Sequence, residues 1–339
     1  MKVGIALPKN APESFKVCVE SVVKYFPRLA LDYCITTDPG LLQSVDVIWD
    51  PCSGGGKPPS SLILSLEKPL VVTLHGVAPL ALSTAYCNGL WAKFSLLKNN
   101  FIKRRIWKDA HECCAVIVTV SEFSKRSIVQ HLPIPEDKLV VIPNAVDYSK
   151  FHDSKFHDSK LTEKLSELEL NSPYFFHISN DQKRKNVDKI ISAYSELDCH
   201  SKWPLLIKIP SARYDAVDGV HFYTQRLDHQ ELVYLYRQAG ALVFPSIYEG
   251  FGLPILEAMA AGCPVITANT TACAEVSGNA APLVDPNSIS DLANAMQLVQ
   301  SDESLCNELV RKGWQRAKEY NWEDAAQQYM KVFELARER

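Results

Sequence analysis

Short apolar runs separated by helical patterns recur along the whole chain. Residues 116–120, apolar except for Thr119, and residues 242–244 lack polar alternation, which is typical of strands buried on both faces. Antiparallel strands with one face in water would alternate, so the pattern favours parallel strands covered by helices. The predicted strands are residues 3–7, 46–49, 70–74, 115–120, 139–142, 174–178, 205–209, 220–222, 241–244 and 264–267.

Helical patterns between these strands complete repeated βα units. They are predicted at residues 14–26, 122–131, 187–197, 230–238 and 254–261. Because 339 residues exceed one ordinary core, the sequence predicts two doubly wound α/β domains. The pentapeptide Phe-His-Asp-Ser-Lys occurs twice in succession, at 151–155 and 156–160, and a direct repeat is tolerated where nothing packs tightly. We therefore predict the domain boundary at 155/156.

Composition excludes several classes of protein. With 47% hydrophobic residues and a net charge of −3, the chain is neither disordered nor a general nucleic-acid binder. No apolar stretch approaches the ~18 residues of a membrane span, and the N-terminal residues 1–8 are typical of a strand rather than a signal peptide. Ten cysteines without a CxxC pair favour free thiols in a reducing compartment, so we expect a cytoplasmic protein.

Residues 245–262 carry the richest local signal. They are predicted to form the end of a buried strand, a turn with Gly250 and Gly252, and a short helix that begins near Pro254 and ends at Gly262. Glycines let the backbone approach a ligand closely, and the N–H groups at a helix start bind anions. The segment therefore predicts a site for a phosphate or diphosphate.

Two glutamates lie in this anion-binding segment. Glu249 stands in the turn and Glu257 follows in the helix. A solvated loop charge and a partner of the helix dipole are the ordinary explanations for the two residues. A carboxylate beside a phosphate is repulsive unless it accepts hydrogen bonds from neutral hydroxyls. Sugar hydroxyls fit that role, ribose for one glutamate and a transferred hexose for the other.

The segment Tyr-Glu-Gly-Phe-Gly-Leu-Pro-Ile-Leu-Glu-Ala-Met-Ala, with its Glu-x7-Glu spacing, resembles the signature of family 4 glycosyltransferases. Residues 120–125, 141–147, 184–187 and 262–286 resemble the same family, so the likeness covers about residues 70–285. It implies the GT-B fold, in which two Rossmann-like domains face each other across a cleft. It also implies a C-terminal helix, within 321–339, that returns to the first domain, leaving 1–155 as the acceptor domain and 156–320 as the nucleotide-sugar domain.

The resemblance implies roles for individual residues. The predicted catalytic residues are His75, Glu249 and Lys185. In the family, the glutamate matching Glu249 contacts hydroxyls of the donor sugar, and the lysine matching Lys185 neutralises the leaving phosphate. The predicted nucleotide-sugar contacts are Asn180, Arg184, Lys185, Gly250, Phe251, Gly252, Leu253 and Glu257. Without the resemblance, His75 is an ordinary structural histidine and Lys185 a solvated surface lysine.

The reaction implied is transfer of a hexosyl group, with retention, from a UDP- or GDP-sugar to a hydroxyl of a glycan, a lipid-linked glycan or a small molecule. No Asp-x-Asp occurs, which argues against a metal bridging the diphosphate, and we expect neither metal nor cofactor. The family's first-loop glycines are missing at 8–12, and its Gly-Arg pair is replaced by Ser179-Asn180. A sugar-nucleotide epimerase and a non-catalytic binding or scaffold protein therefore remain alternatives.

Residues 86–108 interleave cations with aromatic and aliphatic residues and contain no acid. Such a stretch is compatible with docking on an anionic membrane surface or on a polyprenyl-linked acceptor, although a solvated helix face is its more common origin. The alternative is the solvated face of an amphipathic helix in the first domain. Gly54-Gly55-Gly56-Lys57 lacks the upstream glycine and the Ser/Thr of a P-loop and is interpreted as a loop at a strand end.

Overall fold

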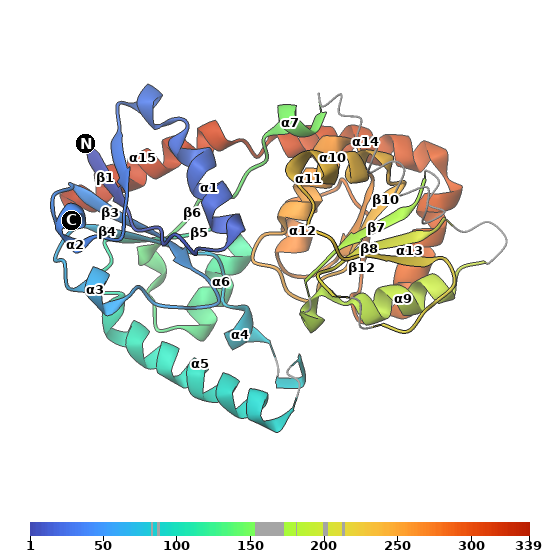
Figure 1. Ribbon diagram of the computed structural model, residues 1–339, viewed down its shortest axis with the longest axis horizontal. Coiled ribbons are helices and arrows are strands. Elements are labelled where there is room, and N and C mark those ends of the chain that lie inside the picture. Colours follow the sequence, from blue (N-terminus) through green and yellow to red (C-terminus); the bar gives the residue numbers. More distant parts are fainter. Residues whose placement is uncertain (83, 87–88, 153–172, 181, 199–202, 212–213) are drawn as a thin grey trace. The chain divides into compact units, whose positions relative to one another are not determined.

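A computed structural model shows the fold (Figure 1), and it describes all residues except 83, 87–88, 153–172, 181, 199–202 and 212–213. The chain divides into two compact units. Unit 1 consists of Met1–Asn144 and Asn321–Arg339, and unit 2 of Ala145–Tyr320. Each unit holds one six-stranded sheet in which all the pairs of neighbouring strands are parallel. The predicted α/β architecture of two doubly wound domains is confirmed, whereas the predicted boundary at 155/156 lies outside the described residues.

The sheet of unit 1 has the order β2-β1-β3-β4-β5-β6. Its strands are β1 (Lys2–Ile5), β2 (Asp32–Ile35), β3 (Val47–Ser53), β4 (Leu70–Leu74), β5 (Val116–Thr119) and β6 (Leu139–Val141). The helices of this unit are α1 (Glu13–Val23), α2 (Pro39–Gln43), α3 (Ser61–Leu64), α4 (Ala78–Ala81), α5 (Leu90–Ala110), α6 (Glu122–His131) and α15 (Trp322–Glu338), with 3-10 turns at Phe26–Leu29, Thr84–Tyr86 and Glu136–Lys138. Of the strands in this sheet, β2 was not predicted, because it is an edge strand with mostly exposed side chains.

The C-terminal helix α15 packs on the sheet of unit 1. The indole N–H of the buried Trp49 donates to Thr73 Oγ1 at 2.9 Å, and that oxygen is 3.0 Å from the hydroxyl of Tyr329. The rings of Trp49 and Tyr329 lie 4.7 Å apart. Phe333 is fully buried against the same residues. The aromatic contacts, together with the hydrogen bonds that Thr73 makes with Trp49 and Tyr329, fix the last helix to strands β3 and β4.

Unit 2 has the strand order β12-β11-β10-β7-β8-β9. Its strands are β7 (Phe175–Ile178), β8 (Leu205–Lys208), β9 (Val220–Tyr223), β10 (Ala241–Phe244), β11 (Val265–Ala268) and β12 (Leu283–Val284). The helices are α7 (Tyr148–His152), α9 (Val187–Ser195), α10 (His229–Gln238), α11 (Leu253–Ala261), α12 (Thr271–Ser277), α13 (Ile289–Ser301) and α14 (Glu303–Lys318), with a 3-10 turn at Lys183–Lys185. Successive strands run outward in opposite directions from β7 and β10, so the topological switch point of this sheet lies between those two strands.

Candidate functional site

The loops that follow β7 and β10 bring three of the predicted residues of unit 2 together, namely Arg184, Lys185 and Glu249. Ligands of open α/β sheets bind at the carboxyl ends of the strands, at the switch point. β7 leads into the 3-10 turn at Lys183–Lys185, and β10 leads into the glycine turn before α11. The backbone N–H of Ile247 donates to the carbonyl of Arg184 at 2.8 Å, which joins the two loops directly.

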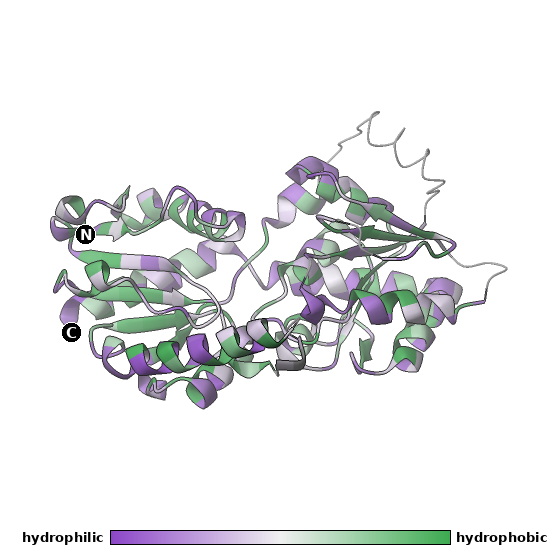
Figure 2. Cartoon of the chain, turned by 60° about the horizontal axis from the view of Figure 1, so that its bottom comes forward, coloured by the Kyte–Doolittle hydropathy of each residue, from purple (hydrophilic) through white to green (hydrophobic). Residues whose placement is uncertain are grey.

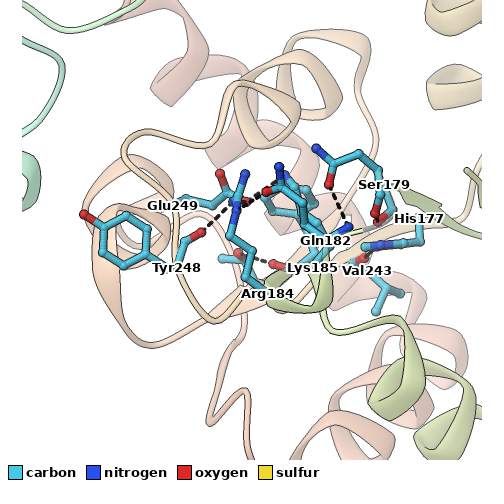
Figure 3. A network of polar contacts seen from close by, with 11 residues as sticks. His177, Ser179, Gln182, Arg184, Lys185, Val243, Tyr248 and Glu249 are labelled. Atoms are coloured by element: carbon cyan, nitrogen blue, oxygen red, sulfur yellow. Dashed lines mark hydrogen bonds and ion pairs between the residues drawn. The ribbon is translucent and has the colours of Figure 1, made fainter. Parts of the chain in front are cut away.

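Glu249 lies between two cations from the β7 loop (Figure 3). Its Oε1 accepts hydrogen bonds from Arg184 Nη1 and Lys185 Nζ, each at 2.7 Å. Only 11% of each of the Glu249 and Lys185 side chains is exposed, so the contacts are shielded from water. Burial alone raises the pKa of Glu249, but Lys185 and Arg184 outweigh it and lower that pKa below its usual value. The three side chains together carry one net positive charge.

Further contacts hold the two cations in place. Arg184 Nη1 also donates to the carbonyl of Tyr248 at 2.7 Å, and its Nε donates to Gln182 Oε1 at 2.6 Å. Lys185 Nζ lies 4.7 Å from the centre of the Phe244 ring, a cation–π distance. Both side chains are therefore oriented before any ligand arrives.

Asn186 is a positioning residue that was not among the predicted site residues. It adopts a left-handed conformation (φ 67°) at the start of α9, which asparagine tolerates better than most residues. Its buried amide donates to the carbonyls of Pro245 at 3.1 Å and Pro286 at 2.6 Å. The side chain thus ties the β7 loop to the segments after β10 and β12. An asparagine directly before an apolar helical run is a signal for a helix start, although the Asn186 side chain makes no capping hydrogen bond to α9.

The glycine turn leads directly into α11, as predicted. Gly252 has φ 99° and precedes Leu253, the first residue of the helix, while Gly262 (φ 81°) ends it. A side chain at position 252 would need this left-handed backbone and would also crowd Ile255. The ring of Phe251 meets Tyr320 edge-on at 5.6 Å. Helix α11 therefore begins four residues after Glu249 in the sequence. The first backbone N–H groups of the helix have no partner within it and can bind an anion.

Glu257 lies one turn into α11, and its hydrogen-bond partner is a tyrosine rather than Arg184 or Lys185. Its Oε2 accepts a hydrogen bond from the hydroxyl of Tyr236 at 3.0 Å. Burial raises the pKa of Glu257 to about 7, although the Tyr236 hydrogen bond opposes the shift. Among the described residues Glu257 has one hydrogen-bond partner and no cationic partner, so its carboxyl group has capacity to accept hydroxyl groups of a ligand.

Replacement of Glu257 by Gln tests the raised pKa directly. Between pH 4.5 and about 7 the folded protein keeps the proton that the unfolded chain has lost, so this group's contribution to stability falls as pH rises. Glu257→Gln is therefore expected to be more stable than the wild type at pH 8, by on the order of 3 kcal/mol, since a shift of one unit is about 1.4 kcal/mol. Below pH 4 the two proteins should melt alike, and a gap that is independent of pH would contradict the assignment.

Asn180 is exposed, whereas Arg184 and Lys185 are partly buried. Its Oδ1 accepts a 3.3 Å hydrogen bond from the N–H of Gln182, and its carbonyl accepts from the Ser179 hydroxyl at 2.7 Å. Asn180 therefore shares the loop of Arg184 and Lys185 without joining the cluster around Glu249. Its predicted contact with the nucleotide sugar stays a prediction.

His177 on β7 is a second buried polar residue that the pattern analysis did not select (Figure 3). A ring nitrogen, Nδ1, lies 2.7 Å from the carbonyl of Val243, and Nε2 is buried without a hydrogen-bond partner among the described residues. Burial lowers its pKa to about 4, so the ring is neutral at pH 7. A histidine inside an apolar strand is the signal that could have drawn attention to it.

His75 belongs to unit 1, where it follows β4. Its Nε2 lies 2.9 Å from the carbonyl oxygen of Pro51, and its ring stacks on Phe15 with the centres 4.5 Å apart. Burial lowers the pKa of His75 to about 4, so the ring is neutral near pH 7. Because a carbonyl can only accept, Nε2 carries the proton of this neutral ring and Nδ1 is left as an acceptor. The described residues contain no group of three or more His, Cys, Asp or Glu side chains placed to hold a metal ion.

Comparisons with known proteins agree with the motifs. Residues 159–316 match the family model described as Glycosyl transferases group 1, and residues 45–150 match Glycosyltransferase Family 4. O-antigen chain mannosyltransferase B of Escherichia coli is 31% identical over 248 residues, which are 68% of this chain and 64% of that protein. This chain thus spans less than two thirds of that relative. The MMP alpha-(1->4)-mannosyltransferase of Mycolicibacterium hassiacum is 26% identical over 306 residues, 86% of this chain and 71% of that protein.

The fold also agrees with that of solved structures. Anabaena HepE, crystallised with UDP and glucose, superimposes with a TM-score of 0.72 at 15% sequence identity, covering 98% of this chain and 99% of HepE. A glycosyltransferase from Rickettsia africae gives a TM-score of 0.71 at 16% identity, covering 99% of this chain and 98% of that one. At such identities the likeness concerns the fold, which is that of the GT-B glycosyltransferases. Family models over both units and the shared fold show that the chain belongs to the glycosyltransferases of group 1 and family 4.

Proposed function

We propose that the protein transfers a hexosyl group from a nucleoside-diphosphate sugar to a hydroxyl acceptor, with retention at the anomeric carbon. The cluster of Arg184, Lys185 and Glu249 at the switch point of unit 2 carries this proposal. Its net positive charge and the adjoining start of α11, equivalent to roughly half a charge, suit a diphosphate. The names of the relatives, mannosyltransferases in the two cited cases, support mannose as the transferred sugar and a glycan as the acceptor.

The proposed reaction breaks the bond between the anomeric carbon and the phosphate oxygen and forms a bond from that carbon to the acceptor oxygen. The acceptor's proton passes to the leaving phosphate, so no general base from the protein is required. Lys185 and Arg184 stabilise the charge that develops on the leaving diphosphate. Glu249 turns from its cations to hydroxyls of the donor sugar, and Glu257 accepts from the ribose. We propose that neither a metal nor a cofactor takes part.

A panel of UDP-, GDP- and ADP-sugars tests this function. The full chain is expected to be stabilised against heat by one nucleotide class and to release that nucleotide slowly from its sugar donor, faster when a glycan acceptor is added. Proton NMR of the product should show the donor's anomeric configuration. An isomerised sugar without transfer would establish the epimerase, and stabilisation with no turnover would establish the binding protein that the replaced Gly-Arg pair suggests. The presence of Arg184 beside Lys185 supports the transferase over the latter.

His75 is expected to act in turnover and not in nucleotide binding. Its neutral ring offers Nδ1 to a hydroxyl group of the donor sugar or the acceptor, whereas the cationic cluster belongs to unit 2. His75→Ala should lower kcat by about ten- to a hundredfold, the effect of one lost hydrogen bond in a transition state, and leave the affinity for the free nucleotide within twofold. Phe15→Leu, which removes the stacked ring only, is the matched control. Equal losses of nucleotide affinity and of kcat in His75→Ala would contradict the assignment.

A further inference from the structure

Helix α5 is held to unit 1 along one face, with Arg104 at the margin of that face donating to the carbonyl of His131 at 3.0 Å. The indole N–H of the buried Trp107 donates to the carbonyl of Gly56 at 3.0 Å, and Lys103 Nζ donates to the carbonyl of Gly55 at 2.7 Å. Asn100 donates to the carbonyl of Pro79 at 2.6 Å. Residues 93, 96, 100, 103, 107 and 110, spaced three and four apart, form this inner face. A side chain at Gly56 would collide with Leu80 of α4, so the glycine loop that accepts these hydrogen bonds is itself closely packed on α4.

The opposite face of α5 exposes large apolar side chains, a group that we call the apolar stripe. Its members and exposed fractions are Leu90 (84%), Trp91 (86%), Phe94 (62%), Leu97 (59%) and Phe101 (68%). Among the described residues outside α5, no large hydrophobic side chain is more than 54% exposed. Side chains spaced three and four apart share one face of a helix, so the stripe is contiguous. Such a patch on a folded unit marks an interaction surface.

Helix α5 carries a large excess of positive charge. The helix contains one acid, Asp109, against Lys93, Lys98, Lys103, Arg104, Arg105 and Lys108. Lys98 is exposed beside the stripe, four residues after Phe94 and three before Phe101. Arg105 and Lys108 are exposed and continue the register of the apolar stripe toward the carboxyl end. There a hollow of about 840 Å³ lies against the end of α6, and the charged side chains that line it are Arg104, Arg105 and Lys108 together with the single acid Asp109. Hydrophobic and hydrophilic residues both recur along α5 (Figure 2).

We propose that α5 lies flat on an anionic lipid bilayer, with the apolar stripe at the level of the upper acyl chains and the cations among the headgroups. An anionic bilayer offers an apolar layer and negative charge side by side, which matches the stripe and its flanking cations. A second copy of the chain fits poorly, because pairing two such helices would bring their cations together without enough acids to neutralise them. No described helix is both long enough and apolar enough to cross a bilayer.

Co-sedimentation of the full chain with vesicles tests this contact. Binding to vesicles of phosphatidylcholine with 30% phosphatidylglycerol is expected to be at least tenfold stronger than to pure phosphatidylcholine, and to weaken as salt is raised. Trp91→Ser/Phe94→Ser and Lys98→Glu/Arg105→Glu should each lower binding to the anionic vesicles at least tenfold. Matched controls in unit 1 are Leu41→Ser/Leu62→Ser and Lys9→Glu/Arg126→Glu, which replace exposed residues outside α5 and should bind like the wild type.

The outcomes separate the lipid surface from its rivals. Equal binding to both vesicle types, or α5 variants that bind like the wild type, would overturn the proposal. Concentration-dependent dimers that Trp91→Ser/Phe94→Ser converts to monomers, with no vesicle binding, would assign the stripe to a second copy instead. Because all four replaced α5 side chains are exposed, unchanged circular dichroism is expected to show that the variants are folded. The test needs no sugar donor, so its result is independent of the proposed glycosyl transfer.

Discussion

Lys185→Ala is expected to lower kcat by about a hundred- to a thousandfold, the range found when one preorganised electrostatic contact to a developing charge is removed. Lys185 Nζ is held 2.7 Å from Glu249 and 4.7 Å from the ring of Phe244, in a site with little exposure to water. The ammonium group is therefore in place before the leaving diphosphate gains charge. The measurement is the rate of nucleotide release under saturating donor, with the donor identified by the sugar panel.

Lys183 supplies the matched control for this prediction. It lies in the same 3-10 turn, but its side chain is exposed and makes none of the contacts described around Glu249. Lys183→Ala should retain kcat within about twofold. Glu249 keeps Arg184 as a partner in Lys185→Ala, so no buried charge is left alone and the variant should fold. Equal activities of the two alanine variants would remove Lys185 from the proposed reaction.

Most of the fold could be predicted from hydropathy alone. Ten of the strands show apolar runs at or within a few residues of their observed bounds, because buried parallel strands are apolar on both faces. The two strands that were missed lack that feature. Strand β2 is exposed along most of its length, and β12 contains only two residues. The edge strands β6 and β9 were predicted, so it is the exposure of β2 and the shortness of β12, and not their place at an edge, that leave no hydropathy pattern.

The candidate site could be predicted residue by residue, but its internal contacts could not. Lys185 and Glu249 are separated by the whole of α9, β8, β9, α10 and β10, and only the order of strands in the sheet places their loops side by side. The salt bridge between them follows from that topology and not from a local spacing. Asn186 was missed for the same reason, since its two carbonyl partners come from distant loops.

Helix α5 shows a different limit of sequence reasoning. The mixture of cations and apolar residues in 86–108 was recognised, and residues 87–88 of that stretch lie outside the described residues. The sequence could not decide which apolar residues face the core, because apolar side chains occur around most of the helix. Trp91 and Trp107 illustrate this, since one is 86% exposed and the other fully buried. The carbonyls of Gly55 and Gly56 accept hydrogen bonds from Lys103 and Trp107, and these contacts determine which face of the helix packs on unit 1.

Glu249→Gln is expected to separate catalysis from nucleotide binding. The change keeps the shape of the side chain but removes its charge, so the net charge of the cluster rises from +1 to +2. Two cations that now share a carboxylate oxygen at 2.7 Å would then repel each other, and a bound diphosphate would relieve that repulsion. We therefore expect the free nucleoside diphosphate to bind about tenfold more tightly, equivalent to about 1.4 kcal/mol.

Turnover should change in the opposite direction in Glu249→Gln. A carboxylate that accepts a hydrogen bond from a sugar hydroxyl contributes about 1.5–3 kcal/mol, so its loss should lower kcat by about ten- to a hundredfold. Glu257→Gln is the matched control, because Glu257 has a tyrosine partner and no cation, and its replacement should weaken nucleotide binding instead. Calorimetric titration with the nucleotide and initial rates distinguish the two variants. Weaker nucleotide binding in Glu249→Gln would show that the carboxylate, and not the cations it restrains, determines how the diphosphate is held.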